Sequence, residues 1–301
     1  MATYTLRQLR YFVCTVEAGS IAEASRQLFI AQPSISSAIK GLEESFNMQL
    51  FIRHHAQGVS LTPAGSRFYQ QARGLLHTAR EFEQNQLAES AGSAGQVNIG
   101  CYESMAPLYV PRLLAGFHQR YPNMAVHMRD GEQQELLEGL NSGSWDLVLL
   151  WDHQLDDSVA TEHLMPPKRP YALFHESHRL AGAPQVALGE LCAEPMILLD
   201  VKPSNAYFLS LFTRQGLTPN VVFRSPSLEM VRGMVGQGAG FSLLVTRPWS
   251  SYTYDGQRLV MVELAGEVEP SGLVAAWLQR SPLTRPAQLF ISHCREHLWY
   301  R

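Results

Sequence analysis

Residues 20–46 read SIAEASRQLFIAQPSISSAIKGLEESF, and the apolar letters in this stretch recur at helical spacing. The apolar residues at 21, 24 and 28 predict one short helix, and those at 35, 39, 42 and 46 predict a second, because steps of three and four place side chains on one helical face. Ser20 and Glu23 have the spacing of a capping box at the start of the first helix. Residues 29–31 alone separate the two helices. The stretch therefore predicts a helix-turn-helix.

The second of these helices carries small, amide and basic side chains away from its apolar face. They are Gln32, Pro33, Ser34, Ser37 and Lys40. When a helix enters the major groove end-first, a Gln side chain can hydrogen-bond adenine through both the carbonyl and the NH₂ of its amide, and Ser can reach a base or a phosphate. An ordinary surface helix with small polar residues has the same pattern. The spacing alone leaves DNA contact and a plain surface helix open.

The residues on either side of this stretch complete a winged arrangement. Thr5 opens a capped helix before it, and short extended pieces around a turn within residues 50–61 predict a two-stranded wing. Arg53 and His54 in the wing are candidate contacts for the phosphates of DNA. His54 and His55 have no third ligand at metal-binding spacing, so we expect solvated wing residues rather than a metal site.

A long helix follows the wing, with Thr62 as its cap and a proline at its first position. Apolar residues recur along this helix at spacings of four and three for less than three heptads. The stripe includes Phe68, Leu75, Ala79 and Phe82. Since no other predicted element of the head would cover the stripe, we expect these four residues to form a dimer interface.

Charge is divided unevenly along the 301 residues of the chain. Residues 1–80 hold eight Lys or Arg and four Asp or Glu, whereas residues 81–301 hold sixteen and twenty-three, within a net charge of -3. A basic head on an acidic body predicts that only the head meets a polyanion such as double-stranded DNA. The length predicts two or three domains. The chain has no apolar run long enough to span a membrane and no signal-peptide pattern, so we expect a cytoplasmic protein without a membrane partner.

The body of the chain alternates between strand-like and helical patterns. Residues 89–95, ESAGSAG, have the small and polar composition of a flexible hinge before it. The strand-like runs are residues 97–101, 125–128, 147–151, 171–174, 196–199, 221–223, 241–244 and 273–278. An amphipathic helix at about residues 286–299 ends the chain. The alternation predicts a parallel α/β architecture.

Polar and aromatic side chains stand where these predicted strands end. Ligands in open parallel sheets bind outside the carboxyl ends of the strands, and several of these residues also precede a predicted helix, whose free N–H groups favour an anion. The candidates for a ligand site are Tyr102, Glu103, Ser104, Gln133, Trp151, Asp200, Ser204, Asn205 and Ser227. For any one of them, a role as helix cap or turn residue is the plain alternative.

The chain contains none of the common catalytic motifs: no GKS/T phosphate loop, no HExxH pair and no GxSxG elbow. The glycine-rich residues 236–240 precede a strand, whereas a dinucleotide fingerprint follows one. Cys101 and the three other cysteines lie far apart, and we expect Cys101 to pack in the core or line a pocket. We therefore expect no enzyme, no cofactor and no metal. The alternatives are a small-molecule-processing α/β enzyme with a DNA-binding head and a DNA-binding protein that needs no effector.

The motifs LRQLRYF at residues 6–12, QPSIS at residues 32–36 and LTPAG at residues 61–65 resemble those of LysR-type transcriptional regulators. The resemblance covers the whole head. It implies a homodimer or homotetramer that binds DNA in response to a small-molecule effector. The implied domains are a winged helix-turn-helix at 1–65, a linker helix and hinge at 66–95, and an effector-binding domain similar to periplasmic binding proteins at 96–301. Its lobe I is expected at about 96–165 and 269–301, and its lobe II at about 166–268.

Three departures from the family pattern concern the head. Ala31 stands where the family usually has a Ser or Thr helix cap, which costs about 1 kcal/mol. Ser37, Gln57 and Ser60 occupy positions that are often basic in the family. We therefore expect fewer phosphate contacts, with weaker affinity for DNA or a narrower operator preference as the result.

Acidic residues at the predicted strand ends bear on the effector, which in this family is often a small carboxylate. Glu103, Glu132, Asp152 and Asp200 stand at or beside those ends. If they face the cleft, they repel an anion. We therefore expect an effector with a cationic or amide end, and with an apolar part against aromatic side chains.

Overall fold

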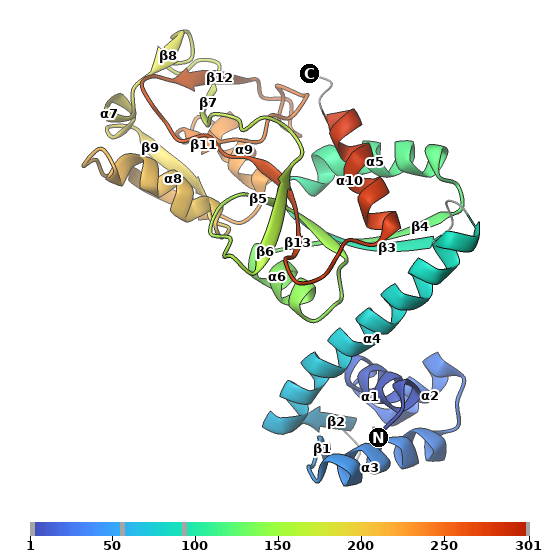
Figure 1. Ribbon diagram of the computed structural model, residues 1–301. Helices are drawn as coiled ribbons and strands as arrows, with labels where there is room; N and C mark the ends of the chain where they lie inside the picture. Colours follow the sequence, from blue (N-terminus) through green and yellow to red (C-terminus); the bar gives the residue numbers. More distant parts are fainter. Residues whose placement is uncertain (1–3, 55–57, 92–94, 299–301) are drawn as a thin grey trace. The chain divides into compact units, whose positions relative to one another are not determined.

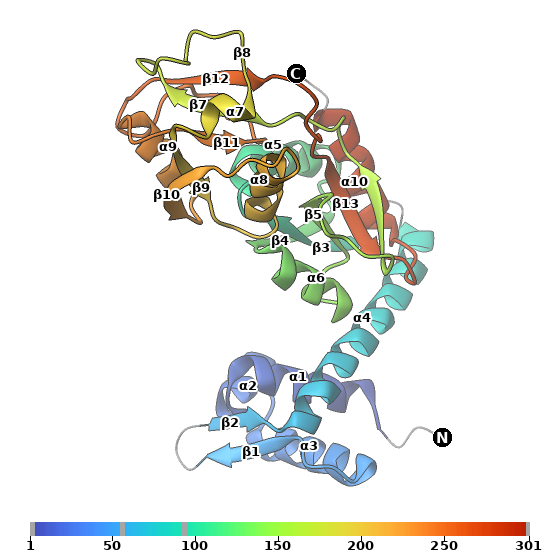
Figure 2. The same cartoon turned by 90° about the vertical axis from the view of Figure 1, so that its left-hand side faces the viewer.

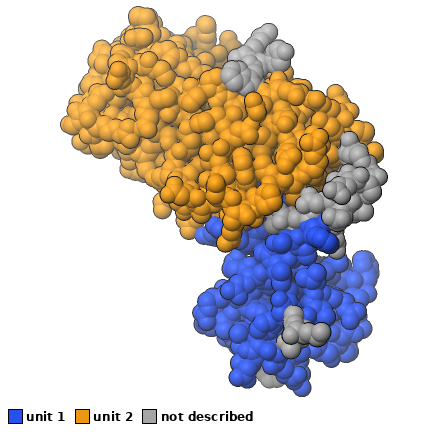
Figure 3. All heavy atoms as spheres, viewed as in Figure 1, with its two compact units in different colours: residues 1–95, 138–146 blue, residues 96–137, 147–301 orange. Residues whose placement is uncertain are grey.

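The computed structural model describes residues 4–54, 58–91 and 95–298. The chain divides into two compact units, which Figure 3 colours separately. Unit 1 comprises residues 1–95 and 138–146, and unit 2 comprises residues 96–137 and 147–301. Within the described ranges, no helix has both the length and the apolar content needed to cross a membrane.

Unit 1 contains the predicted helix-turn-helix, a two-stranded wing and a long helix (Figure 1). Its elements are α1 (Leu6–Ala18), α2 (Ile21–Leu28), α3 (Gln32–Phe46), β1 (Phe51–His54), β2 (Gly58–Leu61) and α4 (Pro63–Ala91). Strands β1 and β2 pair antiparallel and form a hairpin to one side of the helices (Figure 2). The predicted order of helices, the three-residue turn and the wing are confirmed.

Side-chain caps explain where the first two helices begin. The backbone N–H of Gln8 donates to Thr5 Oγ1 at 3.2 Å, and the Gln8 side chain accepts from the backbone N–H of Thr5 at 2.8 Å, so this capping box is present. The Ser20 hydroxyl caps α2 by accepting from the backbone N–H of Glu23 at 3.1 Å. Helix α3 begins without a side-chain cap, because Ala31 stands at that position.

The head buries a core of its own, and the start of α4 belongs to it. Phe68 is only 8% exposed, and its ring centroid lies 5.3 Å from that of Phe12 in α1 and 5.0 Å from that of Phe46 in α3. Ala72, one turn further along α4, is buried in the same cluster. The prediction that Phe68 lies in a dimer interface is therefore wrong, because α1 and α3 already cover it.

A five-stranded sheet forms the first part of unit 2. Its strands are β3 (Gly95–Tyr102), β4 (Met124–Gly131), β5 (Leu147–Trp151), β6 (Val159–His163) and β13 (Leu273–Leu278). They lie in the order β4-β3-β5-β13-β6. Strands β3 and β5 are parallel, but β13 runs antiparallel to both of its neighbours, so the expectation of a parallel sheet is only partly met. The helices in this part of the chain are α5 (Ala106–Arg120), α6 (Gln133–Asn141), whose residues from 138 onward are counted in unit 1, and α10 (Arg285–Leu298). Helices α5 and α10 pack together.

The second part of unit 2 contains a four-stranded sheet and a parallel pair. The four strands, in the order β11-β7-β12-β8, are β11 (Ser242–Leu244), β7 (Tyr171–His175), β12 (Leu259–Leu264) and β8 (Gln185–Val186). The parallel pair is β9 (Pro195–Leu199) and β10 (Asn220–Ser225). The helices are α7 (Leu188–Leu191), α8 (Ser204–Thr213) and α9 (Leu228–Gly236).

Two chain segments connect these two parts of unit 2. The first crossover, residues 164–170, leads from β6 to β7, and the second crossover, residues 265–272, leads from β12 to β13. Lys168 and Ser271 form an antiparallel bridge in which each backbone N–H donates to the other's carbonyl at 2.9 Å. The two crossovers therefore lie side by side, and side chains that project from them are positioned together.

Candidate functional site

The leading end of α3 is exposed and carries the residues predicted to read DNA. Gln32, Pro33, Ser34 and Ser37 are all exposed. The apolar face of the same helix is buried in the head core, which fixes the direction in which these four residues point. The structure thus brings the predicted reading residues together on one surface of unit 1.

Basic residues beside α3 are candidates for phosphate contacts. Lys40 is exposed, and its ammonium lies 3.5 Å from the carboxylate of Glu44. Exposed ion pairs of this kind contribute only ~0–1 kcal/mol, so Lys40 can exchange this partner for a phosphate at little cost. Arg53 and His54 lie on β1, but their side chains are outside the described part of the structure, as is Gln57.

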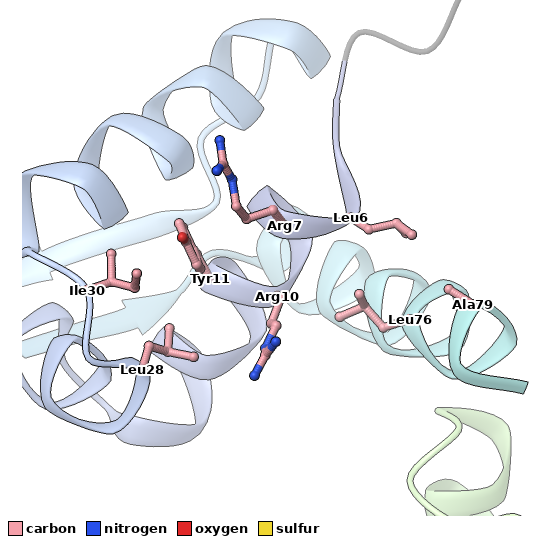
Figure 4. Close-up of a pocket in the computed structure, with 8 residues that line it drawn as sticks. All are labelled: Leu6, Arg7, Arg10, Tyr11, Leu28, Ile30, Leu76 and Ala79. Atoms are coloured by element: carbon pink, nitrogen blue, oxygen red, sulfur yellow. The ribbon is translucent and has the colours of Figure 1, made fainter. Parts of the chain in front are cut away.

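A groove on unit 1 runs beside the part of α4 that was predicted to form a dimer interface. Its volume is about 500 Å³, and its walls are Leu6, Arg7, Arg10, Tyr11, Leu28, Ile30, Leu76 and Ala79. Figure 4 shows Leu76 and Ala79 on the α4 side of the groove and Leu28 and Ile30 on the α2 side. On α4, Leu75 is 40% exposed and Phe82 67% exposed. These two residues and Ala79 remain candidates for an interface.

The strand ends of unit 2 converge on a small cavity, which we call the cleft cavity. It is lined by Ser104, Trp151, His153, Leu199, Ser204, Tyr207, Phe208, Leu244, Val245, Thr246 and Ser271. These residues come from both parts of unit 2 and from the second crossover. The cavity has a volume of about 10 Å³, which is room for about one water molecule. The side chains that line the cleft cavity therefore leave little free space between them.

His153 is a titratable side chain in the wall of the cleft cavity. Its Nε2 atom lies 2.7 Å from the Ser271 hydroxyl, and its ring stacks on Tyr207 with 4.2 Å between the ring centroids. Burial lowers the pKa of His153, although the negative charge of Asp152 opposes this shift. The imidazole is therefore neutral at neutral pH. No residue that lines the cavity then carries a net charge.

Five of the nine predicted effector residues belong to this site or support it. Ser104, Trp151 and Ser204 line the cavity. Tyr102 is fully buried, and its hydroxyl lies 3.2 Å from that of Ser204. Gln133 is buried as well, and its amide donates to the backbone carbonyl of His153 at 2.7 Å. Tyr102 and Gln133 therefore hold lining residues in place.

The structure does not bring the other four, Glu103, Asp200, Asn205 and Ser227, to the cleft cavity. The Asn205 amide donates to the Asp200 carboxylate at 2.8 Å, and the same carboxylate lies 3.5 Å from the Arg224 guanidinium. The Ser227 hydroxyl caps α9. Glu103 follows β3 but is absent from the cavity wall. Asp200, Asn205 and Ser227 thus have local turn or capping partners in this structure, and the assignment of all four residues to the effector site stays a prediction.

The acidic residues that suggested a cationic effector do not line the cleft cavity either. Asp152 accepts the backbone N–H of Gly272 at 2.8 Å, which fixes its carboxylate. Glu103 lies near Glu132 and Asp130, and burial together with these two negative charges raises the pKa of its carboxyl group. The wall of the cleft cavity therefore offers no carboxylate to a cationic or amide-bearing effector, and that effector stays a prediction.

Four polar residues of the cavity were not predicted from the sequence: His153, Tyr207, Thr246 and Ser271. His153 and Thr246 each follow the last residue of a strand by two positions, so the strand-end rule could have included them. Tyr207 lies one turn inside α8. Ser271 precedes a strand instead of following one, and no pattern in the sequence marks it.

Cys101 and Cys294 are both buried in unit 2. Burial raises the pKa of both thiols well above the ordinary value, so they stay protonated and unreactive at neutral pH. Cys101 does not line the cleft cavity. Of the two roles expected for this residue, packing in the core is the one that the structure supports.

Two protein-family models match this chain. Residues 6–66 match the bacterial regulatory helix-turn-helix of the lysR family, and residues 90–299 match the LysR substrate binding domain. Together the two matches include the exposed end of α3 and every residue of the cleft cavity.

Individual proteins with known names or structures are similar over most of the chain. The transcriptional regulator TfdS of Cupriavidus pinatubonensis is 32% identical over 241 residues, which cover 79% of this chain and 81% of TfdS. The crystal structure of HinK, a LysR family transcriptional regulator from Pseudomonas aeruginosa, is 63% identical, with a TM-score of 0.67 and coverage of 98% of this chain and 99% of HinK. A single-residue variant of full-length OxyR from the same organism is 22% identical, with a TM-score of 0.77 and 97% coverage of each chain, and shows the fold alone.

Proposed function

Because this chain belongs to the LysR family of transcriptional regulators, we propose that the leading end of α3 reads operator DNA and that a small molecule in the cleft cavity controls the response. Its relatives are regulators, so the chain is a regulator and not an enzyme. The observation that carries the DNA-reading half of the proposal is the exposure of Gln32, Pro33 and Ser34 on a helix whose opposite face is anchored in the head core.

We assign the winged helix-turn-helix to residues 1–65 and the linker helix and hinge to residues 66–95. The effector-binding domain then begins at residue 96, with lobe I at about 96–165 and 269–301 and lobe II at about 166–268. The arrangement of strands supports this division, because the five-stranded sheet and the remaining strands are joined only by the two crossovers. In this assignment the cleft cavity lies between the lobes.

Gln32→Ala should lower the discrimination of operator sequences by about 1–3 kcal/mol at one or two base pairs, if the amide contacts adenine bidentately. Lys40→Ala should instead weaken binding to every duplex by a similar factor and reduce the salt dependence, because phosphate contacts carry no sequence information. Fluorescence anisotropy with an operator selected from random duplexes, and with its single-base variants, measures both effects. Unchanged single-base penalties in Gln32→Ala would move the reading residues elsewhere on α3.

The cleft cavity supports a small carboxylate as the effector. Its wall offers hydroxyl groups, with Ser104 just before α5 and Ser204 at the start of α8, and helix N-termini favour anions. The wall lacks a charged group, so a carboxylate meets neither repulsion nor a fixed cation. Since the cavity holds about one water in this structure, the effector must open it, and binding then favours the open arrangement.

Carboxylates such as propanoate and succinate should raise the melting temperature of the full-length protein, whereas their amine counterparts should not. A ligand at 100 times its dissociation constant adds about 2.7 kcal/mol to the free energy of unfolding. For a carboxylate that binds, Ser104→Ala should weaken the affinity by roughly tenfold, the worth of one hydrogen bond to a charged group, and Glu103→Gln should leave it unchanged. Tight binding of an amine that is lost in Glu103→Gln would restore the cationic effector. A protein that binds neither class would support the alternative of a regulator without an effector.

A further inference from the structure

Unit 2 contains a second cavity, which we call the crossover pocket. It is lined by Leu108, Tyr109, Arg112, Leu113, Met165, Lys168, Arg247, Pro248, Trp249, His297 and Leu298. Its volume is about 290 Å³, near the lower end of the ~300–1,000 Å³ range of small-molecule sites. The pocket shares no lining residue with the cleft cavity. It is therefore a separate place in unit 2 where a ligand has room.

Three cationic side chains contribute to the wall of this pocket. Arg247 is neutralised in part, because its guanidinium lies 2.9 Å from the carboxylate of Glu263. Arg112 and Lys168 form no ion pair or side-chain hydrogen bond with any residue in the described ranges. His297 also lines the pocket and is the remaining basic side chain there. The wall thus carries an excess of positive charge.

Lys168 shows that this excess is unfavourable in the absence of a ligand. Its side chain is half-buried. Burial lowers the pKa of Lys168, and the positive charge of Arg247 lowers it further. Both causes penalise the charged ammonium, and a bound anion would offset both of them.

The rest of the wall is apolar or aromatic. Leu108 and Leu113 of α5, Met165 of the first crossover and Leu298 of α10 contribute aliphatic surface. Tyr109 adds a ring and a hydroxyl. A ligand that matches both parts of the wall has an anionic head and an apolar body, and pockets of this composition orient a ligand by a few polar groups.

We propose that the crossover pocket binds a small amphipathic carboxylate, with its head at Lys168 and Arg112 and its apolar body against the α5 and α10 side chains. This site differs from the cleft cavity in charge and in size. The two sites nevertheless share backbone, because Lys168 is bridged to Ser271 and Arg247 follows Thr246 directly. A test must therefore add residues outside the crossovers to Lys168, namely Arg112 of α5 for the crossover pocket and Ser104 for the cleft cavity.

Calorimetric titration of the full-length protein with 3-phenylpropanoate tests the proposal. Wild type should bind the carboxylate and should not bind the uncharged 3-phenylpropanamide. Lys168→Met, which keeps most of the side-chain length, should weaken binding about tenfold or more, as expected for the loss of a charge-assisted contact. Arg112→Met should weaken it several-fold, and because Arg112 is exposed on α5, this variant does not threaten the fold.

Lys202→Met is the matched control, since Lys202 is an exposed lysine of unit 2 that lines neither cavity. It should bind 3-phenylpropanoate like wild type. Three results would overturn the proposal: no binding by wild type at millimolar concentration, equal binding of the amide, or full affinity in both Lys168→Met and Arg112→Met. Loss of binding in Ser104→Ala would instead place the probe in the cleft cavity, and so would also reject the crossover pocket. The test depends on binding alone, so it can fail while the regulatory proposal stands.

Discussion

Phe12→Ala should unfold the head of this regulator while unit 2 stays folded and able to bind a ligand. The Phe12 ring is completely buried, and its centroid lies 5.2 Å from that of Phe51 and 5.3 Å from that of Phe68. Truncation of a buried phenylalanine to alanine costs about 3–5 kcal/mol through lost contacts and the cavity that remains. A domain of the head's size has only about 3–10 kcal/mol of stability in total. The substitution therefore removes a large share of it.

Unfolding by a chemical denaturant, monitored by circular dichroism, measures this effect. The variant should show a separate unfolding transition of the head at low denaturant concentration. DNA binding should fall together with that transition. Phe29→Ala is the control, because Phe29 belongs to the same head but is 93% exposed, and its loss should leave the transition in place. If Phe12→Ala shifted the whole protein in one transition, the head and unit 2 would fold as one cooperative body.

Leu75→Asp should separate a homodimer into monomers and reduce DNA binding by about a hundredfold or more, the typical gain from joining two binding modules. Leu75, Ala79 and Phe82 follow one another on α4 at steps of four and three, so they share a face of the helix. Leu75 and Phe82 expose apolar surface on that face. An aspartate there would have to lose its hydration inside an interface, which is strongly unfavourable.

Light scattering measures the mass in solution, and fluorescence anisotropy measures the affinity for a duplex with two half-sites. Gln70→Asp adds the same charge to an exposed position about 140° away around α4 and should leave the mass unchanged. Phe68 cannot serve in this test, because its substitution would disturb the head core. Intact dimers of Leu75→Asp would place the interface in unit 2 instead of on α4.

The head was predictable from the sequence because its signals are local. The cap at Thr5, the turn at residues 29–31 and the apolar period of α3 each depend on residues within a few positions. For Phe68, the local pattern did not identify the packing partner. An apolar stripe along a helix indicates that another surface packs against it. The spacing of the apolar residues is the same whether that surface belongs to the chain's own α1 and α3 or to a second copy of the chain.

The cleft cavity was predictable only in part, because its residues depend on long-range topology. Ser104 lies two residues after β3 and Ser204 five residues after β9, and the strand-end rule found both. Ser271 reaches the cavity because the second crossover is paired with the first, and no strand-end pattern marks it. The acidic residues could not be placed from the sequence, since a sequence does not show that the Asp152 carboxylate accepts a hydrogen bond from the backbone N–H of Gly272.

The position of β13 determines the order in which a newly made chain can fold. All buried residues of the head core lie before residue 73, whereas β13, which lies between β5 and the edge strand β6 of the five-stranded sheet, ends only at Leu278. At roughly 5–20 residues per second of synthesis, the ribosome needs about 10–40 s to make the chain between these points. During this interval the head can fold, while the facing edges of β5 and β6 have no partner strand and can pair with other chains. A nascent regulator therefore has a complete DNA-binding head well before it has a complete sensor, and a chain that stops before β13 keeps the head but leaves two strand edges open to aggregation.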